Sequence, residues 1–347
     1  MGHIEVVRKA IEFKNPEYIP LEIVEVPGIY DEYGNVNPDE VTLLPGTQDF
    51  DALQATFSYV YEDMGKDEKG RPRRRSEWGF VEVVPESKYD YFIVEYPLAD
   101  WDNLGNYQFP DISVTDEYFN RMKKALKNYP ERFITAYIDP GPFLTATYIA
   151  GYEHLLTSLY TDLDKVKYLF DGIINYHMAL VKRWKEVGAH LVSYFDEFAH
   201  QEGLLFSPKL WRDHFKPFYR KIFSFIHEQG MYTGCGLDGK TLEILPDMKE
   251  VGLDVLDCRQ PTLMGIDNLA KICDGKLCIK SSIDMQSTLA TGRPDDVFRE
   301  AEELAKKLGG RGGGFIALVF KWAVLEYPEE NIRASVEAFN RCRKGGI

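Results

Sequence analysis

The stretch His190-Leu-Val-Ser-Tyr-Phe-Asp-Glu197 indicates the fold, because a short and nearly all-apolar run ends in an adjacent acidic pair. The stretch Phe133-Ile-Thr-Ala-Tyr-Ile-Asp139 has the same form and also ends in a carboxylate. Short runs that are apolar at almost every position are typical of strands buried on both faces of a parallel sheet. Both stretches therefore predict parallel strands with carboxylates at their carboxyl ends.

Similar runs recur toward the C-terminus and alternate with segments of helical periodicity. The further expected strands are 231–233, 254–256, 277–280 and 315–320. The expected helices are 116–128, 152–159, 163–187, 207–229, 239–250, 265–273, 294–308 and 328–342. Repeated strand–helix units of this kind favour a (β/α)8 barrel over a doubly wound sheet. We therefore predict an α/β protein in which residues 1–347 form a single TIM-barrel domain, with regular βα repeats over 116–347.

The N-terminal part, residues 1–115, is patterned less regularly. The elements expected there are a helix at 5–13, a strand at 19–26 and an antiparallel hairpin formed by 76–84 and 91–95. This part should supply the first barrel strands and an N-terminal extension. The long segments 27–75 and 96–115 are expected as loops on the rim of the barrel, because long loops in compact domains are usually functional or disordered.

The composition limits the kinds of partner. The chain of 347 residues carries 41 basic and 55 acidic residues, a net charge of −14, which opposes binding to the phosphate backbone of nucleic acid. No run of about 18 apolar residues that could span a membrane occurs in the sequence. The 5 cysteines are odd in number and lack a disulfide-framework spacing, which is typical of a reducing compartment. We therefore expect a cytoplasmic protein without nucleic-acid or membrane partners.

One basic run, Arg71-Pro-Arg-Arg-Arg75, lies in a polar stretch of the N-terminal part. The simplest interpretation of so short a run is a solvated loop. The other interpretation is a docking patch for an acidic partner protein.

Candidate functional residues follow from the rule that barrel chemistry lies at the carboxyl ends of the strands. Asp139, Asp196 and Glu197 are the expected catalytic groups, because a charge at a strand mouth must find a partner or a ligand. Asp139 precedes Pro-Gly-Pro, so a role in shaping a turn is the alternative for it. Three polar residues at or just after expected strand ends are expected to contact a substrate: Gln201, on the same loop as Asp196, and Asp284 and Lys321 after later strands.

Two cysteines also fall near expected strand ends. Cys235 lies between two glycines, which allow a backbone or a ligand to approach closely. Cys258 follows Asp257. Cys235, Cys258 and Asp257 are therefore candidate metal ligands, and burial as small apolar side chains is the alternative for the two cysteines.

Several short motifs, in this order, carry a resemblance to a known family. They are Lys14-Asn-Pro-Glu-Tyr-Ile-Pro20, Glu77-Trp-Gly79, Tyr96-Pro-Leu-Ala-Asp-Trp101, Gly151-Tyr-Glu-His-Leu-Leu156, Phe195-Asp-Glu-Phe-Ala-His-Gln-Glu-Gly203, Ser207-Pro-Lys-Leu-Trp211, Thr233-Gly-Cys-Gly236, Ser282-Ile-Asp284, Gly313-Gly-Phe-Ile316 and Pro328-Glu-Glu-Asn-Ile332. Together they span nearly the whole chain, which resembles the uroporphyrinogen decarboxylase superfamily and, within it, the corrinoid-dependent methyltransferase branch. The resemblance implies a (β/α)8 barrel.

Two departures from the family patterns narrow the expected function. The decarboxylases of the superfamily carry an arginine-rich N-terminal motif, which this chain lacks. The thiol-methylating relatives bind zinc through a His-x-Cys pair and a later cysteine. Here the histidine position is Thr233, the first cysteine is kept as Cys235, and Val319-Phe-Lys321 holds no cysteine. The zinc pattern is thus incomplete, and the resemblance leaves open whether zinc is bound.

What the resemblance then implies is an O-demethylase-type methyltransferase. It would move a methyl group from a small methylated donor, a methoxylated aromatic ether above all, to the cobalt(I) of a corrinoid (cobalamin) carried by a partner protein. A homodimer is a further expectation. Two alternatives remain at this point: a decarboxylase of a porphyrinogen-like or smaller carboxylic acid, and a barrel that binds a ligand without catalysis.

Overall fold

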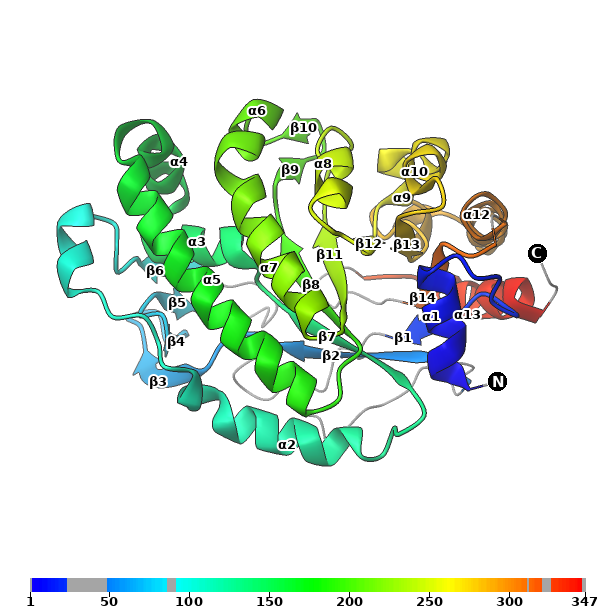
Figure 1. Ribbon diagram of the computed structural model, residues 1–347, viewed down its shortest axis with the longest axis horizontal. Helices are drawn as coiled ribbons and strands as arrows, with labels where there is room; N and C mark the ends of the chain where they lie inside the picture. The colour runs from blue at the N-terminus through cyan, green and yellow to red at the C-terminus, as the bar shows by residue number, and fades with distance from the viewer. Residues whose placement is uncertain (1, 24–48, 86–91, 311, 320–325, 345–347) are drawn as a thin grey trace.

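Parallel strands close into a barrel at the centre of the molecule. The computed structural model describes residues 2–23, 49–85, 92–310, 312–319 and 326–344 (Figure 1). The barrel strands are β1 (Leu21–Ile23), β2 (Ala52–Phe57), β7 (Phe133–Ile138), β8 (Leu191–Asp196), β11 (Tyr232–Leu237), β12 (Val255–Cys258), β13 (Cys278–Ser281) and β14 (Phe315–Val319). Each pairs in parallel with its neighbours in this order, and β14 closes on β1. The predicted (β/α)8 barrel is confirmed.

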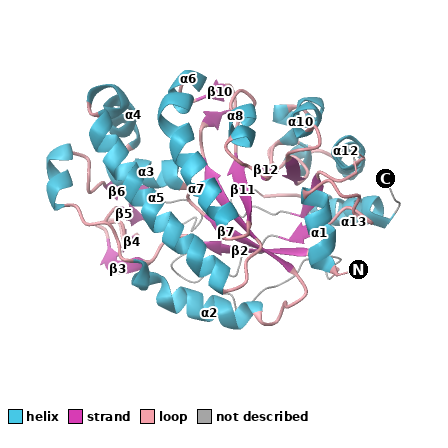
Figure 2. Ribbon diagram, viewed as in Figure 1, coloured by secondary structure: helices cyan, strands magenta, loops and turns pink. Residues whose placement is uncertain are grey.

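Helices surround the barrel on the outside (Figure 2). They are α1 (His3–Ile11), α2 (Asp116–Leu126), α3 (Pro142–Ala150), α4 (Tyr152–Thr161), α5 (Leu163–Glu186), α6 (Pro208–Leu210), α7 (Lys216–Glu228), α8 (Leu245–Glu250), α9 (Pro261–Met264), α10 (Ile266–Cys273), α11 (Thr288–Thr291), α12 (Pro294–Leu304) and α13 (Glu329–Lys344). None of the described helices combines the length and the apolar character needed to cross a membrane.

The N-terminal helix α1 closes one end of the barrel. Its apolar face, with Val7 and Ile11, packs against residues at the beginnings of several strands, among them Phe133, Leu191 and Ile316. The amphipathic pattern of α1 supplies this face. Because this end is filled by apolar side chains, a ligand must enter at the opposite end, where the strands finish.

An antiparallel sheet lies beside the barrel. It consists of β3 (Tyr61–Lys66), β4 (Pro72–Ser76), β5 (Val81–Val83) and β6 (Phe92–Glu95). The antiparallel pairing of β5 with β6 confirms the expected hairpin. The prediction that Arg71–Arg75 forms a loop is wrong, because most of this run is strand β4.

Three arginines of β4 are matched by carboxylates on the other strands of this sheet. Arg74 pairs with the buried Glu82 of β5, and Arg73 pairs with Glu95 of β6. The Arg75 guanidinium lies 3.7 Å from the carboxylate of Glu62 on β3. Opposite charges on adjacent strands stabilise a sheet, which explains why so basic a run forms a strand.

Several elements depart from the sequence-based expectation, and three of them matter for the barrel. β2 falls within 27–75, which is expected from the sequence to be a rim loop; residues 24–48 of that segment lie outside the described part of the chain. β11 extends beyond the expected 231–233. Glycines weaken the strand pattern, so the sequence predicts too short a strand, although the inner face of β11 requires a glycine. A Cβ atom at Gly236 would lie only 2.6 Å from the hydroxyl of Tyr137. Helix α3 follows Asp139-Pro-Gly-Pro and is absent from the expected elements.

Candidate functional site

Three carboxylates follow the ends of neighbouring strands at the open end of the barrel. Side chains alternate between the two faces of a strand, so residues two apart share a face. On β7 the inward side chain of Tyr137 is followed two positions later by Asp139. By the same alternation Glu197 follows Phe195 at the end of β8, and Asp238 follows Gly236 at the end of β11. β7, β8 and β11 are neighbours in the barrel, so Asp139, Glu197 and Asp238 form one acidic cluster.

The environment of this cluster raises the proton affinity of its members. Burial raises the pKa of Asp139 to about 6, and the negative charges of Glu197 and Asp238 act in the same direction. Burial also raises the pKa of Asp238 to about 6, again with a contribution from Glu197. The pKa of Glu197 is raised by burial although its side chain reaches the solvent-exposed rim. Because the charge of Glu197 acts on both aspartates, the protonation of Asp139 and of Asp238 depends on the charge state of the cluster.

Arg259 is the cation that acts most strongly on Asp139 and Asp238. It comes directly after β12, two positions after Asp257, and like Asp257 it faces the barrel interior. Its guanidinium donates to the hydroxyl of Tyr137 at 3.0 Å. It also lies 3.4 Å from the carboxylate of Asp257 and 5.9 Å from the ring centre of Phe195. The guanidinium is thereby held at a fixed place.

A buried ion network supports Arg259 from below. The ammonium of Lys280 on β13 lies 2.5 Å from the carboxylate of Glu22 on β1 and 3.2 Å from that of Asp257. Thr135 on β7 donates to Glu22 at 2.6 Å. Burial alone would raise the pKa of Asp257, but Lys280 and Arg259 hold it below its ordinary value. Among the residues that the structure describes, the network therefore joins two carboxylates and two cations, whose charges balance.

Asp196 points in the opposite direction from its neighbour Glu197. Its carboxylate accepts from the backbone amide of Leu144 at 2.9 Å and from the hydroxyl of Tyr219 on α7, and the residue is fully buried. Burial raises its pKa to about 7. A Cβ atom at Gly141 would lie 2.2 Å from the Asp196 carboxylate, so the beginning of α3 is fitted closely around it. The structure thus places Asp196 between the barrel and the helices, where it anchors α3.

The expected metal ligands do not come together. Cys235 and Cys258 share the outward phase of their strands and belong to the apolar core between barrel and helices. Burial raises the pKa of both thiols above its ordinary value, which disfavours the thiolate that a metal needs. Asp257 faces inward and is occupied by Lys280 and Arg259. No group of three or more His, Cys, Asp or Glu side chains within the described ranges is placed to hold a metal ion. These residues therefore do not fit a zinc site.

The three expected substrate contacts have separate positions. Gln201 lies on the turn between β9 (Ala199–His200) and β10 (Gly203–Leu204), and its amide donates to Gln286 at 2.9 Å across the rim. The carboxylate of Asp284 accepts from the backbone amides of Thr262, Gln286 and Ser287 at 3.0–3.1 Å. Asp284 thus ties the loops after β12 and β13 together. Lys321 lies outside the described residues.

Sequence reasoning missed Asp238, Arg259 and Tyr137. Asp238 has the same signal as Asp139, a carboxylate at the end of a buried strand, but the expected strand ends at residue 233. Arg259 follows Asp257 at the two-residue spacing that puts both on the inner face of β12. Tyr137 is, in the sequence, only one of the apolar residues of its strand.

The run Gly234-Cys-Gly-Leu-Asp-Gly-Lys-Thr241 has the glycine and lysine spacing of a phosphate-binding loop. Such a loop points free backbone amides at the phosphate from the beginning of a helix. Here Gly234 and Gly236 lie within β11, and α8 begins only at Leu245. The amide of Gly239 donates to Gln260, and that of Lys240 to the carbonyl of His200. The run is therefore a strand and a braced turn.

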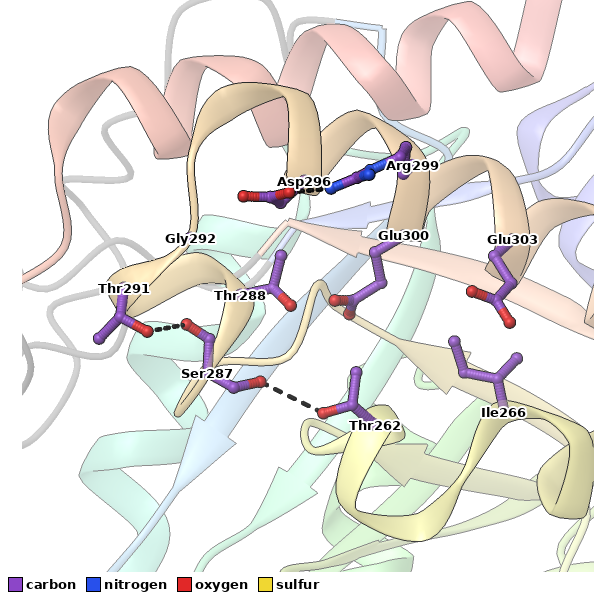
Figure 3. A pocket seen from close by; sticks show the side chains of 10 residues that line it. All are labelled: Thr262, Ile266, Ser287, Thr288, Thr291, Gly292, Asp296, Arg299, Glu300 and Glu303. Atoms are coloured by element: carbon purple, nitrogen blue, oxygen red, sulfur yellow. Dashed lines mark hydrogen bonds and ion pairs between the residues drawn. The ribbon is translucent and has the colours of Figure 1, made fainter.

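A polar pocket of about 450 Å³ lies away from the acidic cluster, between α9, α10, α11 and α12. Glu300 and Glu303 of α12 face Thr262 and Ile266 across it (Figure 3). Burial raises the pKa of Glu300 to about 7, and its carboxylate accepts from the amide of Asp284 at 2.6 Å. Glu300 thus holds the loop after β13 in place. None of the carboxylates at the inner ends of the barrel strands lines this pocket, so the barrel mouth is the better candidate site.

Comparison with known proteins agrees with the barrel fold. Residues 92–342 match the family model described as Uroporphyrinogen decarboxylase (URO-D), and the chain therefore belongs to this family. The family resemblance inferred from the sequence is confirmed. A comparison with curated proteins gave no significant match.

Solved structures with the same fold are distant in sequence. One described as "methyltransferase from Methanosarcina mazei" has a TM-score of 0.71 at 17% identity, over 98% of this chain and 99% of that one. An L-ribulose 3-epimerase has a TM-score of 0.51 at 11% identity, over 94% of this chain and 96% of that one. A D-psicose 3-epimerase has a TM-score of 0.50 at 12% identity, over 94% of this chain and 100% of that one. At these identities the similarity establishes the fold.

Proposed function

We propose that this protein is a methyltransferase that moves a methyl group from a small methylated donor to the cobalt(I) of a corrinoid carried by a partner protein. The proposed donor is a methoxylated aromatic ether, which makes the protein the demethylating component of a larger system. The observation that carries the proposal is the cluster of Asp139, Glu197 and Asp238 at the open end of a barrel of this family. The fold similarity to a protein described as a methyltransferase is further support.

The chemical task is to break a methyl–oxygen bond. The methyl group goes to the cobalt(I) nucleophile, and the electron pair of the broken bond stays on the oxygen as a phenolate. A phenolate is a poor leaving group unless it is protonated or otherwise stabilised as it forms. The protein must therefore supply an acid close to the ether oxygen and hold the methyl group in line with the cobalt.

The acidic cluster fits the role of that acid. A general acid works best when its pKa lies near the operating pH, and the pKa values of about 6 for Asp139 and Asp238 lie closer to neutrality than the ordinary value of a carboxyl group. Glu197 is the member that reaches the rim, where a bound donor would lie. We assign proton delivery to Glu197, with Asp139 and Asp238 keeping a proton in the cluster.

The proposed chemistry needs no protein-bound metal. The candidate zinc ligands Cys235 and Cys258 face away from the mouth, and no step depends on zinc. The corrinoid enters as the acceptor on its partner protein. The proposal of a partner does not rest on the basic run of β4, because those arginines are already matched by carboxylates.

Decarboxylation of a porphyrinogen-like or smaller acid is the alternative function. Such substrates carry carboxylates that must be neutralised by the protein. A mouth with three carboxylates repels them, and its described counter-charge, Arg259, is already in contact with Asp257. The electrostatics of the mouth therefore favour the methyltransferase.

The pH dependence of turnover tests the proposed acid. Because the acid form of a group with raised pKa persists up to that pKa and is lost above it, kcat should be highest below about pH 6 and fall at higher pH. The slope should approach about tenfold per pH unit if one proton is needed. The measurement is kcat for methyl transfer to a reduced corrinoid protein at saturating donor between about pH 5.5 and 9. A profile that is flat or rises over this range would contradict acid catalysis by the cluster.

A further inference from the structure

Among the described residues the acidic cluster has Arg259 as its counter-charge, and it shares this cation with Asp257. The groups that act most strongly on Asp139 by charge are Arg259, Glu197 and Asp238. Arg259 and Lys280 are both in contact with Asp257, and Lys280 also pairs with Glu22, so the two interior cations already balance the two interior carboxylates. Within the described ranges, the three mouth carboxylates therefore leave an excess of negative charge facing the entrance.

Unpartnered polar atoms lie in the barrel interior below the cluster. One carboxylate oxygen of Asp257 and the hydroxyl of Ser282 are buried without a hydrogen-bond partner, although each residue is only about 1% exposed. Both residues belong to the inward phase, since Asp257 contacts Arg259 and Ser282 lies two positions after the inward Lys280. An ionised carboxylate oxygen can only accept hydrogen bonds. A buried acceptor left open is costly, so this oxygen needs an N–H or O–H donor from a water molecule or a ligand.

An aromatic side chain stands at the rim beside the cluster. Tyr152, at the beginning of α4, is 42% exposed, and the charge of Glu197 acts on its hydroxyl. Its ring centre lies 6.4 Å from that of Phe143. An exposed aromatic face next to carboxylates is a typical surface for an aromatic ligand or for an organic cation.

We infer that the methyl donor of this enzyme is an aromatic methyl ether that also carries a protonated amine. This inference rests on the proposed function and adds the charge of the donor to it. The ammonium group offsets the excess of negative charge on the described mouth residues, and its N–H groups are donors for the open acceptors in the interior below them. The aromatic ring lies against the rim, and the ether oxygen faces Glu197. Methoxybenzoates, which carry a carboxylate at the corresponding place, are excluded by repulsion.

Three donors of equal size test the inference: 4-methoxybenzylamine, 4-methoxybenzyl alcohol and 4-methoxybenzoate. Titration calorimetry at about pH 7.5 and low salt should give about tenfold or greater preference for the amine over the alcohol, and no measurable binding of the benzoate. The preference for the amine should shrink as salt is raised. Equal or tighter binding of the benzoate overturns the inference, and so does failure of all three compounds to bind.

Variants that each remove one charge show which residues cause the preference for the amine. Asp238→Asn and Glu197→Gln should each reduce the ratio of amine to alcohol affinity by several-fold, because each removes one negative charge from the mouth. Glu228→Gln is the matched control: Glu228 is exposed at the end of α7, on the side of the barrel where the strands begin, and its loss should leave the ratio unchanged. An equal drop in all three variants would mean that the preference reflects the net charge of the chain, which also overturns the inference.

Binding and methyl transfer separate this inference from the proposed function. Calorimetry reports donor binding without any corrinoid. If the amine binds selectively but no methyl group is transferred, the charge inference holds and the methyltransferase proposal fails. If the benzoate is demethylated faster than the amine, the methyltransferase proposal holds and the charge inference fails.

Discussion

Replacement of Glu197 by glutamine is expected to lower turnover by about 10²–10⁴-fold, because glutamine keeps the shape of the side chain but cannot deliver a proton. Glu197 reaches the rim, so the fold should be unaffected. The measurement is kcat for methyl transfer, together with a thermal unfolding curve. Full activity of Glu197→Gln would remove Glu197 from the mechanism.

The adjacent residue provides the matched control. Asp196→Ala removes the acceptor for the Leu144 amide and the Tyr219 hydroxyl, so it should lower the free energy of unfolding by about 1–3 kcal/mol. At a temperature where this variant remains folded, its turnover should fall far less than that of Glu197→Gln. The opposite result, a stable Asp196 variant without activity and an active Glu197 variant, would make Asp196 the acid and Glu197 dispensable.

Replacement of Lys280 by methionine is expected to lower the free energy of unfolding by about 3–5 kcal/mol, the usual cost of breaking a buried ion network on one side. Lys280 is 2% exposed and neutralises both Glu22 and Asp257. Without it two carboxylates remain in the barrel interior opposite one cation. Chemical denaturation of the wild type and the variant measures the difference.

The control for this prediction is Lys123→Met, at an exposed position of α2. It removes the same charge from the surface and should change stability by no more than about 0.5 kcal/mol. A Lys280 variant as stable as the Lys123 variant would contradict a balanced charge network in the barrel. Arg259 should also lose its fixed position in the Lys280 variant, so turnover should fall together with stability.

The barrel could be predicted from the sequence because its strands from β7 onward are buried on both faces and apolar almost throughout. β2 escaped prediction because its inward positions, Gln54 and Thr56, are polar, and the resulting alternation does not single it out as a buried strand. The strand predicted for β11 is too short because glycines are weak strand formers. The reason for Gly236 is visible only in the structure, where Tyr137 occupies the space beside it on the inner face of the barrel.

The candidate site was less predictable than the fold. The sequence indicates where a strand ends, but it does not readily show which of the alternating side chains face the barrel interior. In the adjacent pair Asp196-Glu197 one side chain must face the barrel interior and the other the helices. The sequence does not say which, and the structure turns Glu197 toward the mouth. The same ambiguity applies to Cys235 and to Cys258, whose outward phase takes both away from the mouth. Arg259 becomes visible as part of the site only through its contact with Tyr137, 122 positions away in the chain.

The absorption spectrum of a reduced corrinoid protein mixed with this protein and 4-methoxybenzylamine tests the methyltransferase assignment most directly. We predict loss of the cobalt(I) absorption at a rate proportional to the concentration of this protein, with release of one 4-hydroxybenzylamine for each corrinoid that is methylated. Mixtures that lack either the donor or this protein should keep the cobalt(I) spectrum. A cobalt(I) spectrum that persists with every methoxylated donor offered, while the protein releases carbon dioxide from a carboxylic acid, would contradict the assignment.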